Sequence, residues 1–283
     1  MLELSAEMSA LFGTDDAAFD RIFHLTGQEF RNREGRETLR VEIGGQYYFL
    51  KRHCGYGWKY ILRTLLTGGF PCISARTELE AIRRFQQAGI STVDVVGFGE
   101  RGRNPATRQS FLLMRELCGC CDLEQLCQTW PIQPPAPKFR QALMKAIGNT
   151  TRLMHSAGLN HRDYYLIHLW LEQPTADDGE LRLHVIDLHR AMWHRRVPLY
   201  WRVKDLAALL FSARDFGITK SDCLRFLRAY RGRPLREVFT EEPTLWRLVL
   251  LRSNHLFRKL NHRQPVGELR VPRLQPGREA YGV

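Results

Sequence analysis

The sequence predicts an α+β fold made of two lobes, a small strand-rich N-lobe and a larger helical C-lobe. Alternating apolar residues and turn signals dominate the N-terminal part of the chain, whereas apolar residues at helical spacing dominate the rest. A proline-rich stretch, PIQPPAP (131–137), lies soon after this change of pattern. We place the boundary so that the N-lobe covers residues 1–116 and the C-lobe covers residues 117–283.

The strands of the predicted N-lobe follow one another with short turns. Alternation in TLRVEI (38–43) and YYFLK (47–51) predicts two strands, and the Gly-Gly pair between them is typical of a two-residue hairpin turn. Two further strands are predicted later in the lobe, VDVVGFGE (93–100) and SFLLMREL (110–117).

Helices are predicted in both lobes. RTELEAIRRFQQ (76–87) is a helix inserted in the N-lobe, because its Leu, Ile and Phe residues recur at helical spacing. The C-lobe opens with a long amphipathic helix over Lys138–Ser156, followed by the short strands LIHLWL and LRLHVIDL. The remaining helices are KDLAALLFSA (204–213), SDCLRFLRAY (221–230) and PTLWRLVLLRSNHLFRKL (243–260).

Composition indicates a cytoplasmic protein with a polyanionic partner. The formal net charge is +12, which favours a nucleotide, a nucleic acid, an anionic membrane or an acidic protein as partner. The N-terminus lacks the basic and apolar regions of a secretory signal, and LAALLF (206–211) is too short to cross a bilayer. The cysteine spacing from 118 to 127 matches no common zinc pattern, so the 7 cysteines are expected to be reduced thiols.

An ordered set of residues along the chain matches the needs of phosphoryl transfer, which are a cation on the nucleotide phosphates, a carboxylate for Mg²⁺ and a base. Lys51 ends a strand and is the candidate cation. Glu78, in the next helix, is its candidate partner, with Glu80 as the alternative. The strand end at Glu116 and Leu117 is the candidate hinge that offers backbone groups to adenine.

The C-lobe supplies the carboxylates of this set. Asp163 in NHRDYYLIHLWL (160–171) follows a helix stop and is the candidate base that orients the acceptor hydroxyl. Asp187 ends the apolar strand LRLHVI and is the candidate Mg²⁺ ligand, whereas Asp205 is expected to bond the backbone of the catalytic loop. Each residue alone has an ordinary interpretation, such as a surface lysine or a capping aspartate. Together and in this order they predict a protein-kinase-like phosphotransferase that uses ATP and Mg²⁺.

Two features depart from the usual kinase pattern. The glycine-rich phosphate loop is absent, and its turn, RNREGRET, carries Arg31, Arg33 and Arg36, which either supply charge to phosphates or form a solvated hairpin. His168 stands five residues after Asp163, where such loops carry a metal-binding asparagine. Because Mg²⁺ prefers oxygen ligands, His168 is a weaker second metal ligand, and the alternatives are a tie within the loop or a phosphate contact.

The motifs NHRDYYLIHLWL, VIDLHRA, FLKR and AIRRFQQAGI resemble the lipopolysaccharide core heptose(I) kinases of Gram-negative bacteria. The resemblance implies ATP-dependent phosphorylation of the first inner-core heptose at O4. The acceptor would be the lipid A–core oligosaccharide at the cytosolic face of the inner membrane. It also implies that Asp163 is catalytic and that Lys51, Glu78 and Asp187 bind the nucleotide and metal. A Kdo kinase, an aminoglycoside-type phosphotransferase and a non-catalytic pseudokinase or nucleic-acid-binding module are the competing interpretations.

Three basic or amphipathic segments indicate additional partners. YGWKYILRTLL (56–66) places apolar residues on one helical face, which suits either an anionic membrane surface or packing on the N-lobe. MWHRRVPLYWRVK (192–204) interleaves bases and aromatics and either grips anionic sugars or forms a packed loop. The basic tail (251–283) suits phospholipid, the acceptor, an acidic protein partner or simple solubility. No zinc-finger, RRM or helix-turn-helix signature is present, so nucleic acid is not expected as a partner.

Overall fold

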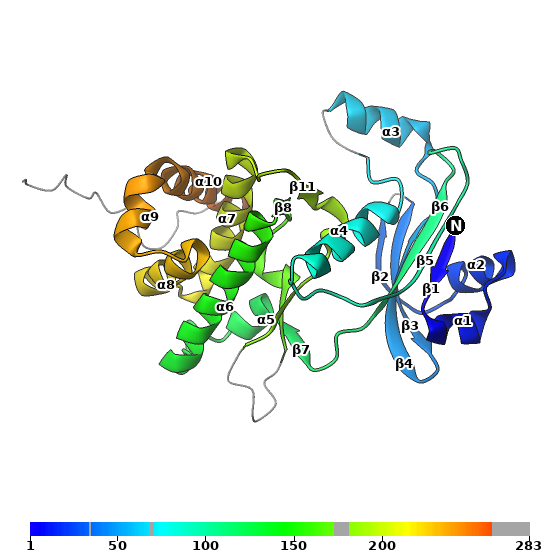
Figure 1. Ribbon diagram of the computed structural model, residues 1–283, viewed down its shortest axis with the longest axis horizontal. Helices are drawn as coiled ribbons and strands as arrows, with labels where there is room; N and C mark the ends of the chain where they lie inside the picture. The colour runs from blue at the N-terminus through cyan, green and yellow to red at the C-terminus, as the bar shows by residue number, and fades with distance from the viewer. Residues whose placement is uncertain (34, 68–70, 173–180, 262–283) are drawn as a thin grey trace, which may run out of the picture. The chain divides into compact units, whose positions relative to one another are not determined.

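The protein was analysed as a computed structural model, which describes residues 1–33, 35–67, 71–172 and 181–261 (Figure 1). The chain divides into two compact units. The first comprises Met1–Gly119 together with Val185–Ala191, and the second comprises Cys120–His184 and the chain from Met192 onward. The first division therefore lies three residues beyond the boundary proposed from the sequence, and a short segment of the predicted C-lobe groups with the first unit.

The first unit is built on a six-stranded antiparallel sheet with the order β1-β5-β6-β4-β3-β2. The predicted hairpin is present, because Ile43 pairs with Gln46 and both intervening glycines have positive φ angles of 58° and 77°. The strands are β1 (Leu2–Leu4), β2 (Gln28–Arg33), β3 (Arg36–Ile43), β4 (Gln46–His53), β5 (Val95–Arg101) and β6 (Gln109–Arg115).

Helices accompany this sheet. The predicted helix over 76–87 is confirmed as α4 (Arg76–Gln87), and the amphipathic segment forms α3 (Gly57–Leu66). Two helices near the N-terminus, α1 (Ala6–Phe12) and α2 (Asp16–Phe23), were not predicted. Each is capped by a side chain that accepts a backbone N–H, and apolar residues of α1 and α2 pack on the sheet in one buried cluster with Tyr48, Phe111 and Leu113.

The second unit is mostly helical. The long predicted helix is present as α6 (Pro137–Ser156), and the three later helices are present as α7, α8 and α10. The structure differs at LIHLWL, which begins as a 3-10 turn (Leu166–His168) and becomes strand β9 (Leu169–Glu172) only afterwards. The elements of this part of the chain are β7 (Cys120–Asp122), α5 (Leu123–Cys127), β8 (Leu159–Asn160), β10 (Leu183–Val185), β11 (Met192–Trp193), α7 (Leu199–Ala213), α8 (Lys220–Arg231), α9 (Leu235–Glu241) and α10 (Pro243–Asn261).

Close packing of α6 against α8 depends on a glycine in the middle of α6. A Cβ atom placed on Gly148 would lie 2.6 Å from the Cβ of Ala229 and 2.8 Å from the carbonyl oxygen of Phe226. The absence of a side chain therefore lets the two helix backbones approach, although glycine is a poor helix former. Among the described helices, none has the length and apolar character needed to span a membrane.

The segment 192–204, for which a packed loop was one interpretation, forms a short strand and the start of a helix. Met192 and Trp193 form β11, which pairs with β8 next to the predicted catalytic loop. Pro198 then precedes α7, which begins at Leu199 and carries the rest of the segment. Of the basic tail, the part up to residue 261 belongs to α10, and the remainder lies outside the described residues.

Candidate active site

Lys51 is the centre of a buried charged cluster in the first unit. Strand β4, held between β3 and β6, carries this lysine, and its Nζ donates to Glu78 Oε1 at 2.5 Å and to Asp187 Oδ1 at 2.8 Å. Glu78 lies on the buried face of α4, with a side chain that is 3% exposed. The predicted partnership of Lys51 is therefore present with Glu78 and not with the alternative, Glu80.

Asp187 joins this cluster through an unusual backbone conformation. Its φ and ψ angles are 58° and 54°, in the left-handed region, which costs a residue other than glycine about 1–3 kcal/mol. His189 Nδ1 lies 2.9 Å from Asp187 Oδ1, the same oxygen that accepts from Lys51. Burial raises the pKa of Asp187, but Lys51 and the hydrogen bond with His189 outweigh it and hold the pKa well below its usual range. The carboxylate is therefore ionised, as a metal ligand must be.

Arg36, from the RNREGRET turn, reaches the cluster. It begins β3, and its Nη2 lies 3.5 Å from Glu78 Oε2 and 3.7 Å from Asp187 Oδ1. Its side chain is only 12% exposed, and its Nε is buried without a hydrogen-bond partner among the described residues. Arg31, by contrast, is exposed on β2. Two cations thus face two carboxylates, and the formal charges of these four side chains cancel.

The two predicted hinge residues, Glu116 and Leu117, differ in their hydrogen bonds. Glu116 forms a two-point ion pair with Arg40, at 2.9 and 2.8 Å, and its backbone N–H donates to the carbonyl of Tyr47 at 3.1 Å. Its side chain and amide therefore brace the sheet. The amide of Leu117 has no backbone hydrogen bond with a described residue, so Leu117 is the better placed of the two to offer an amide to a ligand.

The predicted catalytic loop lies in the second unit and is held by Asp205. This aspartate of α7 is fully buried, and its two carboxylate oxygens accept the backbone N–H groups of His161 at 2.9 Å and Arg162 at 2.8 Å. His155 Nε2 lies 3.4 Å from Asp205 Oδ2. The structural role predicted for Asp205 is confirmed. It supports a bend in which Arg162 has a φ of 74°, the second left-handed residue other than glycine among those described.

Within this loop, His168 acts on the backbone of Asp163. His168 Nδ1 lies 2.7 Å from the carbonyl oxygen of Asp163, a geometry in which the ring N–H donates. The ring of His168 also stacks on that of His161, with centroids 5.4 Å apart, and His161 Nδ1 accepts the N–H of Asp163 at 3.3 Å. The two imidazoles thus hold the backbone of Asp163 at its N–H and at its carbonyl oxygen, and the residue as a whole is half-buried. Of the roles considered for His168, the tie within the loop is the one that this geometry supports.

Two contributors to the site were not singled out from the sequence. His189 was given no role from the sequence, yet its Nδ1 lies 2.9 Å from Asp187 Oδ1. His161 was not named as a site residue, and its ring stacks with that of His168. The available signal was the spacing of these histidines from the aspartates. His189 lies two residues after Asp187, and His161 and His168 lie two residues before and five residues after Asp163.

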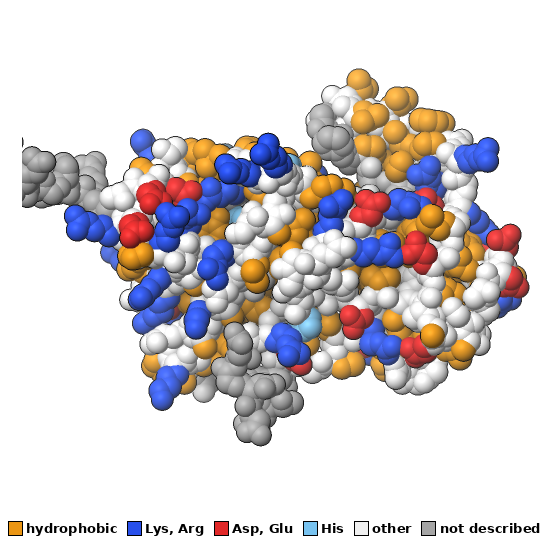
Figure 2. All heavy atoms as spheres, in the orientation of Figure 1, with side chains coloured by type: hydrophobic (Ala, Val, Ile, Leu, Met, Phe, Trp, Pro, Cys, Tyr) orange, Lys and Arg blue, Asp and Glu red, His pale blue; other side chains and the backbone are white. Residues whose placement is uncertain are grey.

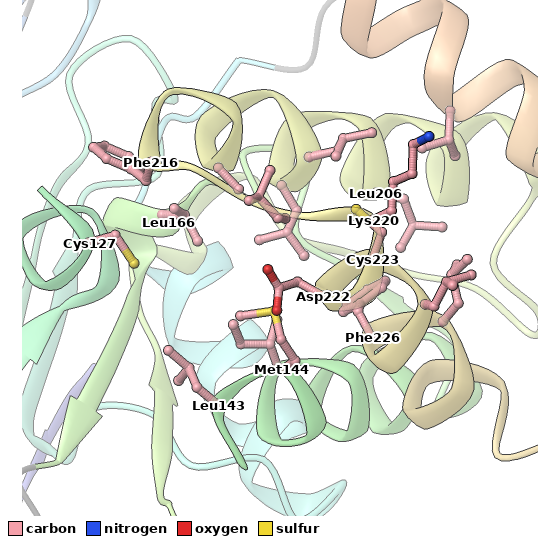
Figure 3. Close-up of a pocket in the computed structure, with 18 of the residues that line it drawn as sticks. Cys127, Leu143, Met144, Leu166, Leu206, Phe216, Lys220, Asp222, Cys223 and Phe226 are labelled. Atoms are coloured by element: carbon pink, nitrogen blue, oxygen red, sulfur yellow. The ribbon is translucent and has the colours of Figure 1, made fainter. Parts of the chain in front are cut away.

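The second unit also contains an apolar cavity of about 220 Å³ (Figure 3). Side chains from α6, α7 and α8 point into it, including Met144, Leu206 and Phe226. Asp222 lies at its wall and is neutralised by Arg140, whose Nη2 is 2.7 Å from Asp222 Oδ2. The lining is otherwise almost wholly hydrophobic, so the cavity suits a hydrocarbon chain better than a polar metabolite.

Comparison with known proteins identifies the family. Residues 20–230 match the model of the lipopolysaccharide kinase (Kdo/WaaP) family. The chain belongs to this family. It is 44% identical, over 89% of its length and 93% of the relative, to the lipopolysaccharide core heptose(I) kinase WaaP of Pseudomonas aeruginosa. It is 39% identical, over 90% of its length and 97% of the relative, to the enzyme of the same name from Escherichia coli K12.

A solved structure agrees with these relatives. The structure described as WaaP in complex with acyl carrier protein superposes with a TM-score of 0.75 and 42% identity, covering 91% of this chain and 99% of that one. The predicted fold class, with a strand-rich first part and a helical second part, is confirmed by this match. The family resemblance seen in the motifs is confirmed as well.

Proposed function

We propose that this protein transfers the γ-phosphoryl group of ATP to O4 of the first heptose of the lipopolysaccharide inner core. The heptose(I) kinases with which it shares 39–44% identity support the acceptor. The observation that carries the reaction type is the cluster of Lys51, Glu78 and Asp187, in which a buried lysine is held by two carboxylates. Protein kinases use a lysine–glutamate pair and a metal-binding aspartate in this way.

The donor set of the first unit suits Mg²⁺ bound together with the nucleotide. Among the described residues no group of three or more His, Cys, Asp or Glu side chains gathers as a metal cage. Mg²⁺ commonly takes only one or two protein carboxylates and completes its coordination with phosphates and water. Asp187 is the residue that would hold it, and the bound ion would neutralise charge on the phosphates. Lys51 would turn from Asp187 toward the α- and β-phosphates, while Glu78 keeps it oriented.

Arg36 would make a second cationic contact with the phosphates, in addition to that of Lys51. The chain has no glycine-rich loop, so backbone amides cannot supply the positive field that such a loop provides. A guanidinium that is 12% exposed and 3.7 Å from Asp187 can supply it instead. We expect Arg36→Gln to raise the KM for ATP about tenfold, the equivalent of one lost charge-assisted hydrogen bond, whereas the exposed Arg31→Gln leaves it unchanged. An equal KM for both variants would remove Arg36 from the site.

Asp163 is the proposed base. Its carboxylate would accept the proton of the O4 hydroxyl as the oxygen attacks the γ-phosphorus and the bond to the leaving ADP oxygen breaks. The backbone of Asp163 is held by hydrogen bonds with His161 and His168, which support the position of its side chain. His168 thus contributes by positioning, and the metal role considered for it in the sequence is not needed.

The reaction is tested with the purified full chain, Mg-ATP and inner-core lipopolysaccharide from which phosphate has been removed. Mass spectrometry and sugar linkage analysis should find one phosphate on O4 of the first heptose, and Asp163→Asn should abolish it. Phosphate on a Kdo residue would redirect the assignment to the other activity named in the family. Hydrolysis of ATP without sugar phosphorylation would point to a different acceptor.

We further propose that an acyl carrier protein is a partner. The solved relative is a complex with such a protein, and this chain combines a net charge of +12 with an apolar cavity in the second unit. The acyl chain would enter that cavity, while basic residues would face the carrier. Native mass spectrometry of protein purified from a Gram-negative host should show a carrier bearing an acyl chain. Leu209→Trp, which fills the cavity from its α7 wall, should reduce the bound fraction, and the exposed Leu251→Trp should not.

A further inference from the structure

Helix α3 (Gly57–Leu66) has an apolar face that the rest of the first unit leaves uncovered. Trp58, Leu62, Leu65 and Leu66 are 53%, 54%, 52% and 87% exposed, whereas Ile61 is 5% exposed. At 100° per residue the four exposed residues fall within one arc of about 100°. Figure 2 shows hydrophobic side chains gathered over this helix. The alternative considered from the sequence, a helix that packs its apolar face on the lobe, therefore holds only for Ile61.

The helix is joined to the rest of the first unit at its N-terminal end. The N–H of Gly57 donates to the carbonyl of Ala106 at 2.9 Å, and the ring of Tyr56 stacks on that of Tyr60 with centroids 4.7 Å apart. At its C-terminal end, the N–H and hydroxyl of Thr67 both donate to the carbonyl of Arg63 and so close the last turn of the helix. The apolar face is thus presented by an ordered element, and exposed leucines on such an element call for a partner.

Charge identifies the kind of partner. No Asp or Glu occurs between residues 53 and 77, a stretch that contains Lys59, Arg63 and Arg76. On the helical wheel Lys59 and Arg63 border the exposed apolar arc, on the side next to Leu66. Both side chains are exposed. A helix with an apolar face, a basic border, a tryptophan and no acid matches the pattern of segments that lie in the plane of an anionic bilayer surface.

We propose that α3 is a membrane-docking helix, which inserts Trp58, Leu62, Leu65 and Leu66 into the interface of an anionic phospholipid bilayer. The inference rests on the proposed function only in that a lipid-linked acceptor gives a kinase a reason to stay at the membrane. Lys59 and Arg63 would lie at the level of the phosphates, as long basic side chains do at interfaces.

The test measures binding of the full chain to vesicles by co-flotation. We expect binding to vesicles of phosphatidylcholine mixed with phosphatidylglycerol, and weaker binding to phosphatidylcholine alone. The Leu62→Gln/Leu66→Gln double variant should lose more than about tenfold in binding, because two large apolar side chains leave the bilayer. The matched control is Leu251→Gln/Leu260→Gln on α10, where both leucines are 54% exposed, and it should bind like the wild type.

A second readout places the helix in the lipid. Brominated phospholipid should quench part of the tryptophan fluorescence of the wild type. Trp58→Phe should abolish this quenching, because the other five tryptophans lie outside α3. Wild-type protein that ignores anionic vesicles, or a double variant that binds them normally, would falsify the proposal. A dimer that dissociates on introducing the double variant would instead show that a second copy covers the helix.

Phosphoryl transfer to acceptor dispersed in detergent keeps this inference separate from the proposed function. The double variant should phosphorylate dispersed acceptor at the wild-type rate and fall behind only with acceptor embedded in vesicles. A protein that binds vesicles through α3 but phosphorylates neither form would contradict the proposed reaction alone. Equal rates on both forms, with normal vesicle binding, would contradict the docking role alone.

Discussion

At the scale of single residues, the charged cluster of the first unit explains why three separate stretches of sequence carry lysine and carboxylates. Burial lowers the pKa of Lys51, but Glu78 and Asp187 raise it further, so the amine stays charged. Each carboxylate in turn depends on the lysine, because a buried ion without a partner is costly. The cluster is therefore a balanced set, and the removal of one member disturbs the others.

Lys51→Met tests this balance. It leaves Glu78 and Asp187 without the lysine and beside Arg36 and His189. We expect the free energy of unfolding to fall by about 3 kcal/mol, as for other broken buried ion pairs. Kinase activity should fall below detection. Lys51→Met/Glu78→Gln should recover part of the stability, measured by urea unfolding, but none of the activity. Equal stability of the single and double variants would show that Glu78 does not depend on Lys51.

His53 gives the cluster a pH dependence. Burial, then Arg36 and Lys51, lower the pKa of this histidine from 6.5 to about 3, and the Tyr56 hydroxyl lies 2.9 Å from its Nδ1. The unfolded chain therefore binds a proton at His53 that the folded chain does not. Its contribution to stability is present above pH 6.5 and is lost as the pH falls from 6.5 toward 3, by up to about 1.4 kcal/mol per unit. Urea midpoints of His53→Gln should decline less than those of the wild type over this range, and parallel declines would refute the assignment.

At the scale of elements, the sequence predicted the helices and strands that bury one regularly spaced apolar face. The helix α4 and the β3–β4 hairpin were predicted because spacing and a Gly-Gly turn determine them locally. The helices α1 and α2 were missed although Ser5 and Asp15 are good caps, since each helix is too short for a clear period. The 3-10 turn at Leu166–His168 was missed because it is set by tertiary bonds, including that of Leu166 N–H to Ser212 Oγ.

The contact between α6 and α8 makes a prediction that opposes helix propensity. Gly148→Ala would raise the propensity of α6 by about 1 kcal/mol, but its new methyl group would meet Ala229 at 2.6 Å. We expect a net loss of about 1–2 kcal/mol, as for other overpacked cores. Thermal unfolding should show a lower Tm for Gly148→Ala and little change for the neighbouring Asn149→Ala. A higher Tm for Gly148→Ala would mean that α8 can move away without cost.

At the scale of the whole molecule, candidate site residues could be proposed from the sequence because kinase chemistry needs certain residue types in a set order. Their supports could not. The tie from His168 to the backbone of Asp163, and the pair of amides held by Asp205, join residues up to 44 positions apart and leave no local pattern. The hydrogen bond from the Glu116 amide to the carbonyl of Tyr47 could not be predicted from the sequence either, because it depends on strand register.

Nucleotide binding should stabilise the molecule only when metal is present. With Mg-ATP at about 100 times its Kd, linkage predicts about 2.7 kcal/mol of added stability. Chelation by EDTA should remove most of this gain, because Asp187 repels phosphates unless a cation lies between them. Differential scanning fluorimetry of the wild type and Asp187→Asn measures the effect. A gain that survives EDTA in the wild type would place the nucleotide away from Asp187.

The division of the chain has a consequence for any attempt to cut the protein into working pieces. The backbone passes from one unit to the other at 119/120, 184/185 and 191/192, so seven residues of the first unit are delivered from the middle of the second. A fragment that stops at Gly119 would contain Lys51, Glu78 and Arg36 but not Asp187. Such a fragment would carry one cation in excess of its carboxylates in the cluster and would lack the proposed metal ligand. A fragment that keeps the whole charged cluster therefore needs residues 185–191 joined to the first unit by a designed linker, because a single cleavage after Gly119 removes them.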